Sequence, residues 1–219
     1  MRNYIKYVAY LIVLIGFSVA RAGSYDDFFV AIKRDSAAMV SALLDRGFDP
    51  NTLNPEGEYG LILALRERSL HVAEVLIANP ATRVEVRTAE DESPLMLAAI
   101  RGYAAVCQQL IERDADVNKP GWTPLHYAAT GGHEDIMQLL LDNNAYVDAA
   151  SPNGSTPLMM AAMYGTAAAV RLLLEAGADP SLKNDLGLTA IDFAAKVQKT
   201  DSVAIIAEFI RAQRPKGSW

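Results

Sequence analysis

The chain has 219 residues, of which 51% are hydrophobic and 21% charged, and its formal charge is −6. This apolar content supports a packed core and argues against intrinsic disorder. The acidic balance argues against nucleic acid and anionic lipid as partners, because both require a cationic surface that displaces counterions.

Residues 1–22 have the pattern of a secretory signal peptide. Two cations precede an uncharged apolar run over 7–19, and a small-x-small motif follows, which predicts cleavage between Ala22 and Gly23. The run is shorter than the roughly 20 residues that span a bilayer, so we expect export without stable membrane insertion once the signal is removed. Cleavage removes three cations and no acid, which changes the formal charge from −6 to −9. An uncleaved membrane anchor is the alternative.

The rest of the chain repeats itself. The run Thr-Pro-Leu-His at 123–126 has counterparts that begin at Thr156 and Thr189, spaced by 33 residues, and another at Ser93, 30 residues upstream. Weaker copies begin near residues 59 and 26. Self-similarity at a fixed period predicts a repeat architecture, in which neighbouring repeats bury one another's apolar faces.

Each repeat predicts two short helices and a turn. Thr or Ser caps the first helix and Pro occupies its first turn, where the missing N–H costs nothing. Gly102, Gly132 and Gly165 are expected to end first helices in the left-handed conformation. The second helix shows apolar residues at i, i+3 and i+4 spacing, as over 136–141, and a polar turn such as 151–154 follows.

These motifs make the chain resemble the ankyrin-repeat family, whose Thr-Pro-Leu-His motif and period it shares over about residues 25–211. The resemblance implies an all-α solenoid of about six helix-turn-helix repeats with projecting hairpin fingers. The domain would cover 23–211, with a polar tail at 212–219. Its repeats would begin near residues 26, 59, 93, 123, 156 and 189.

The resemblance also implies a function and a location. It implies a non-catalytic scaffold that binds another protein through the concave face and the fingertips and needs no cofactor. Exported ankyrin arrays without a further domain resemble bacterial periplasmic proteins, so we expect a periplasmic location. Some such relatives are associated with peroxide defence, which suggests a catalase or another stress-defence protein as the partner.

Two places depart from the regular repeat. The 30-residue spacing means that the turn at 118–121 lacks three residues, so we expect a shortened finger there. Pro80 stands where other repeats have Gly, Asn or Asp, and one extra residue falls within 81–92. We expect a distorted finger at this second place.

Catalytic and metal chemistry finds little support in the sequence. Of the three histidines, His126 and His133 belong to the repeat that begins at Thr123 and His71 lies about two repeats away, and the resemblance implies that His126 makes a structural hydrogen bond between repeats. Neither a P-loop nor a dinucleotide-binding glycine motif is present. Cys107 lies in an apolar helical stretch, which favours a small buried hydrophobe over a reactive thiol.

The variable positions of the repeats supply the expected binding surface. In ankyrin-like stacks, partners meet the fingertips and the exposed face of the first helices. Trp and Tyr concentrate binding energy, and Met adapts to irregular partners. Met160 is expected to pack against neighbouring helices instead. The predicted partner-binding residues are Met96, Ile100, Arg101, Trp122, Met159, Met163, Tyr164 and Leu188.

Two other functions stay open from the sequence. One is an enzyme or small-ligand binder that uses the concave groove. The other is a membrane-tethered scaffold that retains residues 1–22.

Overall fold

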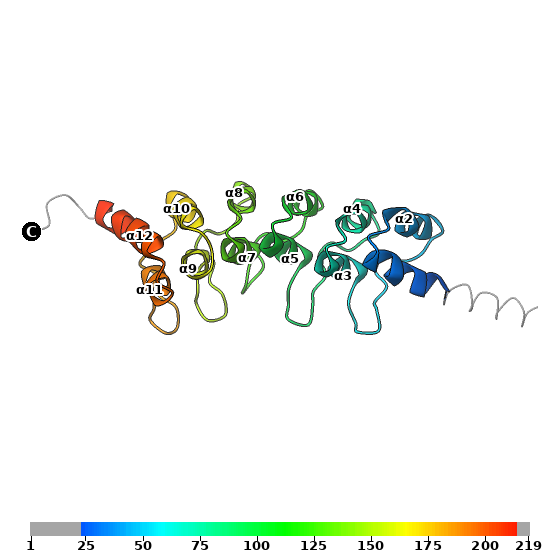
Figure 1. Ribbon diagram of the computed structural model, residues 1–219, viewed down its shortest axis with the longest axis horizontal. Coiled ribbons are helices and arrows are strands. Elements are labelled where there is room, and N and C mark those ends of the chain that lie inside the picture. Colours follow the sequence, from blue (N-terminus) through cyan, green and yellow to red (C-terminus); the bar gives the residue numbers. More distant parts are fainter. Residues whose placement is uncertain (1–22, 214–219) are drawn as a thin grey trace, which may run out of the picture. The chain divides into compact units, whose positions relative to one another are not determined.

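The computed structural model describes residues 23–213 (Figure 1). The chain divides into two compact units between Arg83 and Val84. The predicted signal peptide, with Ala22 at its cleavage site, lies outside the described residues, as does the tail from 214 onwards. Within 23–213, no helix is both long enough and apolar enough to cross a membrane.

The first compact unit consists of two helix pairs. Residues 23–33 are helical and pass through Asp26 and Asp27 without a break. Its other helices are α2 (Ala37–Asp45), α3 (Gly60–Glu67) and α4 (Leu70–Ala78). Helix α4 packs against both α2 and α3. Fully buried Phe28, Ile32 and Leu76 belong to its core, so the weakly matching first repeats still bury an apolar interior.

The second compact unit contains four helix pairs in regular alternation. They are α5 (Pro94–Arg101), α6 (Ala104–Glu112), α7 (Pro124–Gly131), α8 (Glu134–Asp142), α9 (Pro157–Met163), α10 (Ala167–Glu175), α11 (Ala190–Lys196) and α12 (Thr200–Ala212). The first helices α5, α7, α9 and α11 contact one another in order, and so do the second helices α6, α8, α10 and α12 (Figure 1). The predicted all-α stack of helix-turn-helix repeats is confirmed.

The third residue of each first helix in this unit caps the start of its own helix. Its side chain turns back and accepts a hydrogen bond from the backbone N–H of the residue before the helix, a reciprocal capping arrangement. The acceptors and donors are Met96 Sδ with Ser93 N (3.4 Å), His126 Nδ1 with Thr123 N (3.2 Å), Met159 Sδ with Thr156 N (3.4 Å) and Asp192 Oδ2 with Thr189 N (2.8 Å). This repeat position is therefore buried in α5, α7 and α9, whereas Asp192 makes the same cap at an exposed position of α11.

The residue that precedes a second helix ties one repeat to the previous one. His133 donates from Nε2 to the Ile100 carbonyl oxygen at 3.1 Å, and Lys199 donates from Nζ to the Gly165 carbonyl oxygen. In the first compact unit, Ser69 Oγ makes the corresponding bond to the Ile32 carbonyl at 2.6 Å. These bonds satisfy carbonyl groups near the ends of first helices, which have no partner within their own helix.

Glycine ends the first helices as predicted at two of the three named positions. Gly102 and Gly132 adopt φ values of 76° and 70°, in the left-handed region. Gly165 does not adopt positive φ, so the prediction is wrong there. A methyl group on Gly165 would lie 2.3 Å from the Ala129 carbonyl oxygen, so close approach between α7 and α9 requires glycine at this position.

The fingers are tight hairpins, and one of them is short. Residues 151–155 and 184–188 each close with a backbone hydrogen bond between their first and last residues. The loop before α7 lacks such a tip and projects less than the loops before α9 and α11 (Figure 1), which confirms the shortened finger. At the tip over 88–92, Asp91 takes positive φ (62°) where other tips have glycine.

Charged side chains brace the shortened finger from the neighbouring one. Lys119 is only 6% exposed, and its ammonium group pairs with Asp91, which also lies 3.5 Å from Nε of Arg87. The hydrogen bond from Lys119 is the main reason that the pKa of Asp91 falls below its ordinary value. The ion pair holds this finger in place without a hairpin tip.

Candidate partner-binding site

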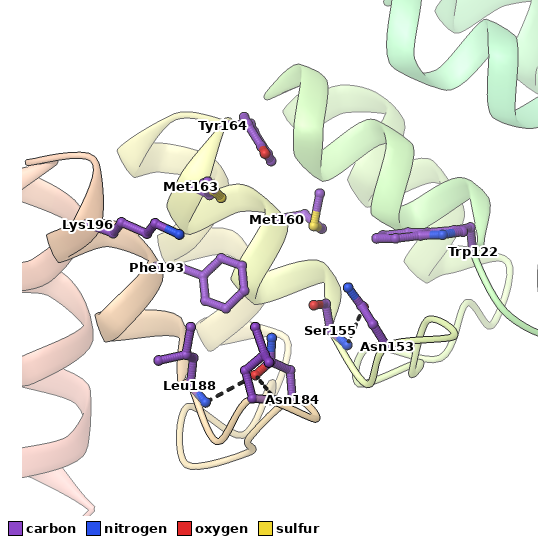
Figure 2. Close-up of a pocket in the computed structure, with 11 residues that line it drawn as sticks. Trp122, Asn153, Ser155, Met160, Met163, Tyr164, Asn184, Leu188, Phe193 and Lys196 are labelled. Carbon is purple, nitrogen blue, oxygen red and sulfur yellow. Dashed lines mark hydrogen bonds between the residues drawn. The ribbon is translucent and has the colours of Figure 1, made fainter.

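A hollow of about 450 Å³ opens along α9 and α11 in the second compact unit (Figure 2). Three successive fingers and these two first helices supply its lining. The lining residues are Trp122, Asn153, Ser155, Met160, Met163, Tyr164, Asn184, Leu186, Leu188, Phe193 and Lys196.

Most of the hollow is an apolar and aromatic wall. Figure 2 shows the Met160 side chain between Trp122 and Phe193, while Met163 and Tyr164 continue the wall at the end of α9. Tyr164 is 55% exposed, and Leu186 at the tip of the next finger is 80% exposed. Isolated apolar side chains are common on protein surfaces, whereas a cluster of them around a depression is a candidate binding surface.

The position of Trp122 depends on His126 beneath it. The two rings meet edge to face, with centroids 5.2 Å apart and an interplanar angle of 79°. His126 accepts hydrogen bonds at Nδ1 from the backbone and hydroxyl of Thr123, so its proton is on Nε2, which donates to the Ser155 carbonyl oxygen at 2.9 Å. The imidazole therefore joins two repeats, as the resemblance implied, and supports the indole.

Burial also fixes the charge of His126. Its side chain has no exposed surface, and this desolvation lowers its pKa from 6.5 to about 4. The imidazole is therefore neutral near pH 7. It acts as one donor and one acceptor in the core and offers no proton to a ligand in the hollow.

The two asparagine side chains in the hollow are arranged as donors. Oδ1 of Asn153 accepts from the Ser151 hydroxyl and the Ser155 backbone at 2.7 and 3.2 Å. Oδ1 of Asn184 accepts from the backbone N–H groups of Leu186 and Leu188, each at 3.1 Å. Because both oxygens are engaged, only the NH₂ groups of these two side-chain amides remain able to form hydrogen bonds with a ligand.

Four of the predicted binding residues come together in this hollow: Trp122, Met163, Tyr164 and Leu188. Met96 and Met159 do not, and the expectation that they form exposed surface is wrong, since each is only 1% exposed. Both are the inward-turned third residues that cap α5 and α9. Ile100 and Arg101 lie at the end of α5 and do not line the hollow.

Met160 was expected to pack against neighbouring helices, but it is half-buried and lines the hollow. The side chain after the capping position faces outward in α9 and again, as Phe193, in α11. Sequence reasoning missed Phe193, the fingertip Leu186 and the charged Lys196. Leu186 had a signal, since it is an apolar residue between Asp185 and Gly187 in a predicted turn.

Several chemically reactive or metal-ligating side chains of residues 23–213 lie outside the hollow. Among the described residues, no group of three His, Cys, Asp or Glu side chains could hold a metal ion. Cys107 is fully buried, and burial raises the pKa of its thiol to about 12. His71 is exposed in the first compact unit, where its hydrogen bond to Asp35 raises its pKa.

Comparison with known proteins identifies related sequences along nearly the whole described chain. Residues 28–120 and 81–151 match the family described as ankyrin repeats (3 copies), and residues 147–194 match ankyrin repeats (many copies). The B-cell lymphoma 3 protein homolog of Mus musculus is 33% identical over 153 residues, which is 67% of this chain and 34% of that protein.

Two further relatives match longer stretches. The ankyrin repeat and KH domain-containing protein mask-1 of Caenorhabditis elegans is 31% identical over 189 residues, 85% of this chain and 7% of that protein. The transient receptor potential cation channel subfamily A member 1 of Homo sapiens is 30% identical over 173 residues, 74% of this chain and 15% of that protein. The chain thus spans about a third or less of the length of these three relatives.

Proposed function

Because the chain belongs to the ankyrin-repeat family, we propose that it is a scaffold that binds another protein in the hollow along α9 and α11. Ankyrin repeats generally mediate protein–protein interaction, and proteins built from them are generally non-catalytic. Some relatives carry additional catalytic domains, such as a putative palmitoyltransferase of Danio rerio.

The observation that supports this proposal is the exposed apolar surface at the hollow. Trp, Tyr and Met side chains gather there above a rigid layer of capped helices, and aromatic residues of this kind dominate the energy of protein interfaces. Leu186 is 80% exposed although it is a large aliphatic side chain, and contact with a partner would remove this apolar area from water.

We further propose that the protein acts after export, in a bacterial periplasm. The basis is the signal-peptide pattern over residues 1–22, together with the resemblance to exported ankyrin arrays. Intact-mass measurement of the protein from its natural host tests this proposal: a chain that begins at Gly23 supports it, and a mass that retains residues 1–22 contradicts it. A catalase or another stress-defence protein is the partner that the resemblance suggests.

Site-specific photo-crosslinking tests the binding surface. A photoreactive residue placed at Leu186 should capture one defined protein in the natural host, and Tyr164→Ala should abolish or sharply reduce that product. Met39→Ala is the matched control, because Met39 is 41% exposed in the first compact unit, outside the lining of the hollow. Capture that is unchanged by Tyr164→Ala, or reduced as strongly by Met39→Ala, would show that the hollow is not the surface that the partner uses.

A further inference from the structure

Among the residues of 23–213 that line the hollow, Lys196 alone has a cationic side chain. It is exposed at the end of α11, and it forms no ion pair with any residue in 23–213. Asp192 lies one helical turn earlier, but Oδ2 of its carboxylate accepts from the backbone N–H and the hydroxyl of Thr189, at 2.8 and 2.7 Å, instead of pairing with Lys196. The aromatic hollow therefore has an unpaired cation at one end, on a chain whose formal charge is −6.

The neutral polar groups point to the same class of ligand. The side-chain amides of Asn153 and Asn184 have used their oxygens on finger backbone and hydroxyl groups, so they can offer only N–H donors. The Ser155 carbonyl already accepts from His126 and from the Ser151 backbone. A ligand in this hollow thus meets an ammonium group and amide donors, which favour a ligand that supplies acceptors.

A segment of extended polypeptide supplies acceptors in the required form. Its backbone carbonyl groups are free, whereas those in the middle of a helix are already bonded within the helix. Amide donors on two neighbouring fingers suit backbone carbonyls, and the Lys196 ammonium suits a carboxylate. Between them, Trp122, Met160 and Phe193 suit one bulky apolar side chain.

From this arrangement we propose that the hollow binds an extended segment of the partner protein in which a bulky apolar side chain lies next to a glutamate or aspartate. The apolar side chain packs between Trp122 and Phe193, and the acidic side chain pairs with Lys196. The proposal deepens the proposed function and rests on it, since it specifies the chemistry of the partner at the same surface.

A phage-displayed library of random linear peptides is the probe, selected against the purified protein. Enriched peptides should share a Phe, Leu or Trp adjacent to Glu or Asp. Selection against Lys196→Glu should lose the acidic residue and enrich Lys or Arg, and a peptide selected on the natural sequence should bind this variant roughly tenfold more weakly. Lys196→Gln, which removes the charge without reversing it, should give an intermediate loss.

Fluorescence shows whether these peptides enter the hollow. The chain has two tryptophans, so Trp219→Phe leaves Trp122 as the only source of tryptophan emission. Synthetic peptides without tryptophan should shift or quench this emission on binding. Lys33→Glu is the matched control, since it makes the same charge change at an exposed residue of the first compact unit and should leave the affinity unchanged.

The outcomes distinguish the proposed extended, acidic segment from the broader proposal that a protein binds in the hollow. Peptides that change Trp122 emission but bind Lys196→Glu as tightly as the natural sequence would refute the acidic partner and leave the binding surface intact. Absence of any enriched peptide would refute the extended segment, while crosslinking from position 186 independently decides whether a protein binds there. Selection of basic peptides on the natural sequence would also refute the proposal.

Discussion

Replacement of His126 by Met should destabilise the folded protein at pH 8 and stabilise it at pH 5. Met occupies the same position in the repeats on either side, as Met96 and Met159, and there its sulfur accepts the capping N–H that His126 Nδ1 accepts. The substitution therefore keeps the cap and loses the bond from Nε2 to the Ser155 carbonyl. That carbonyl still accepts from the Ser151 backbone at 2.9 Å, so the loss at pH 8 should be about 1 kcal/mol.

In acid, protonation of His126 in the unfolded chain lowers the stability of the natural protein, which favours the Met variant. Burial lowers the pKa of His126 to about 4 in the folded protein, against 6.5 for an exposed histidine. Between these values the unfolded chain binds the additional proton, so folding stability falls as pH decreases from 6.5 toward 4. At pH 5 this linkage removes about 2 kcal/mol, a cost that the Met variant does not carry. The variant should then be the more stable protein by about 1 kcal/mol.

Guanidinium unfolding followed by circular dichroism at both pH values measures the two differences in unfolding free energy. Other titrating groups are shared by the two proteins and cancel in the comparison. Met159→Leu is the control, because it alters the same repeat position without a titrating group and should show the same difference from the natural protein at pH 8 and pH 5. If His126→Met gave a difference that did not change with pH, a neutral buried imidazole would be the wrong explanation.

Three further predictions concern packing, charge and thiol chemistry. Gly165→Ala should lower the unfolding free energy by more than about 2 kcal/mol, because the added methyl group clashes with the Ala129 carbonyl. Gly47→Ala should lower it by about 1 kcal/mol, because Gly47 has φ 84° but open space around it. Chemical denaturation compares the two variants, and equal losses would contradict the clash. Lys119→Met should raise the pKa of Asp91 toward its ordinary value, and an unchanged NMR titration of that carboxylate would show that the ion pair does not form. Cys107 should resist a thiol reagent in the native protein and react after unfolding, and rapid native labelling would contradict its burial.

The repeat period and the capping chemistry predicted the fold, because both depend on local residue choices that recur along the chain. Helix starts at Pro94, Pro124 and Pro157 follow directly from the Ser-Pro or Thr-Pro motif. The orientation of individual side chains was harder to predict. First helices of seven or eight residues show too few turns for their periodicity to distinguish the third position from the fourth, so Met159 and Met160 were assigned to the wrong faces.

The polar character of the hollow lay beyond sequence reasoning. Asn153 and Asn184 read as ordinary turn residues, and their role as donors appears only once their oxygens are seen to be engaged within the fingers. Lys196 likewise matched the general preference for cations at the end of a helix. Its isolation became evident only when Asp192 was found to cap the helix start.

The shortened finger shows how this protein can change its surface without changing its scaffold. Three residues are missing from the loop before α7, yet α5, α7 and α9 still pack in unbroken order. Asn118 keeps the base of the loop in register through bonds to the Asn144 carbonyl and the Tyr146 backbone, at 2.7 and 2.8 Å. Insertion or deletion at such a tip therefore changes how far a finger projects during evolution, whereas substitution at Trp122 changes a single side chain of the surface. Neither change requires the helices to be redesigned.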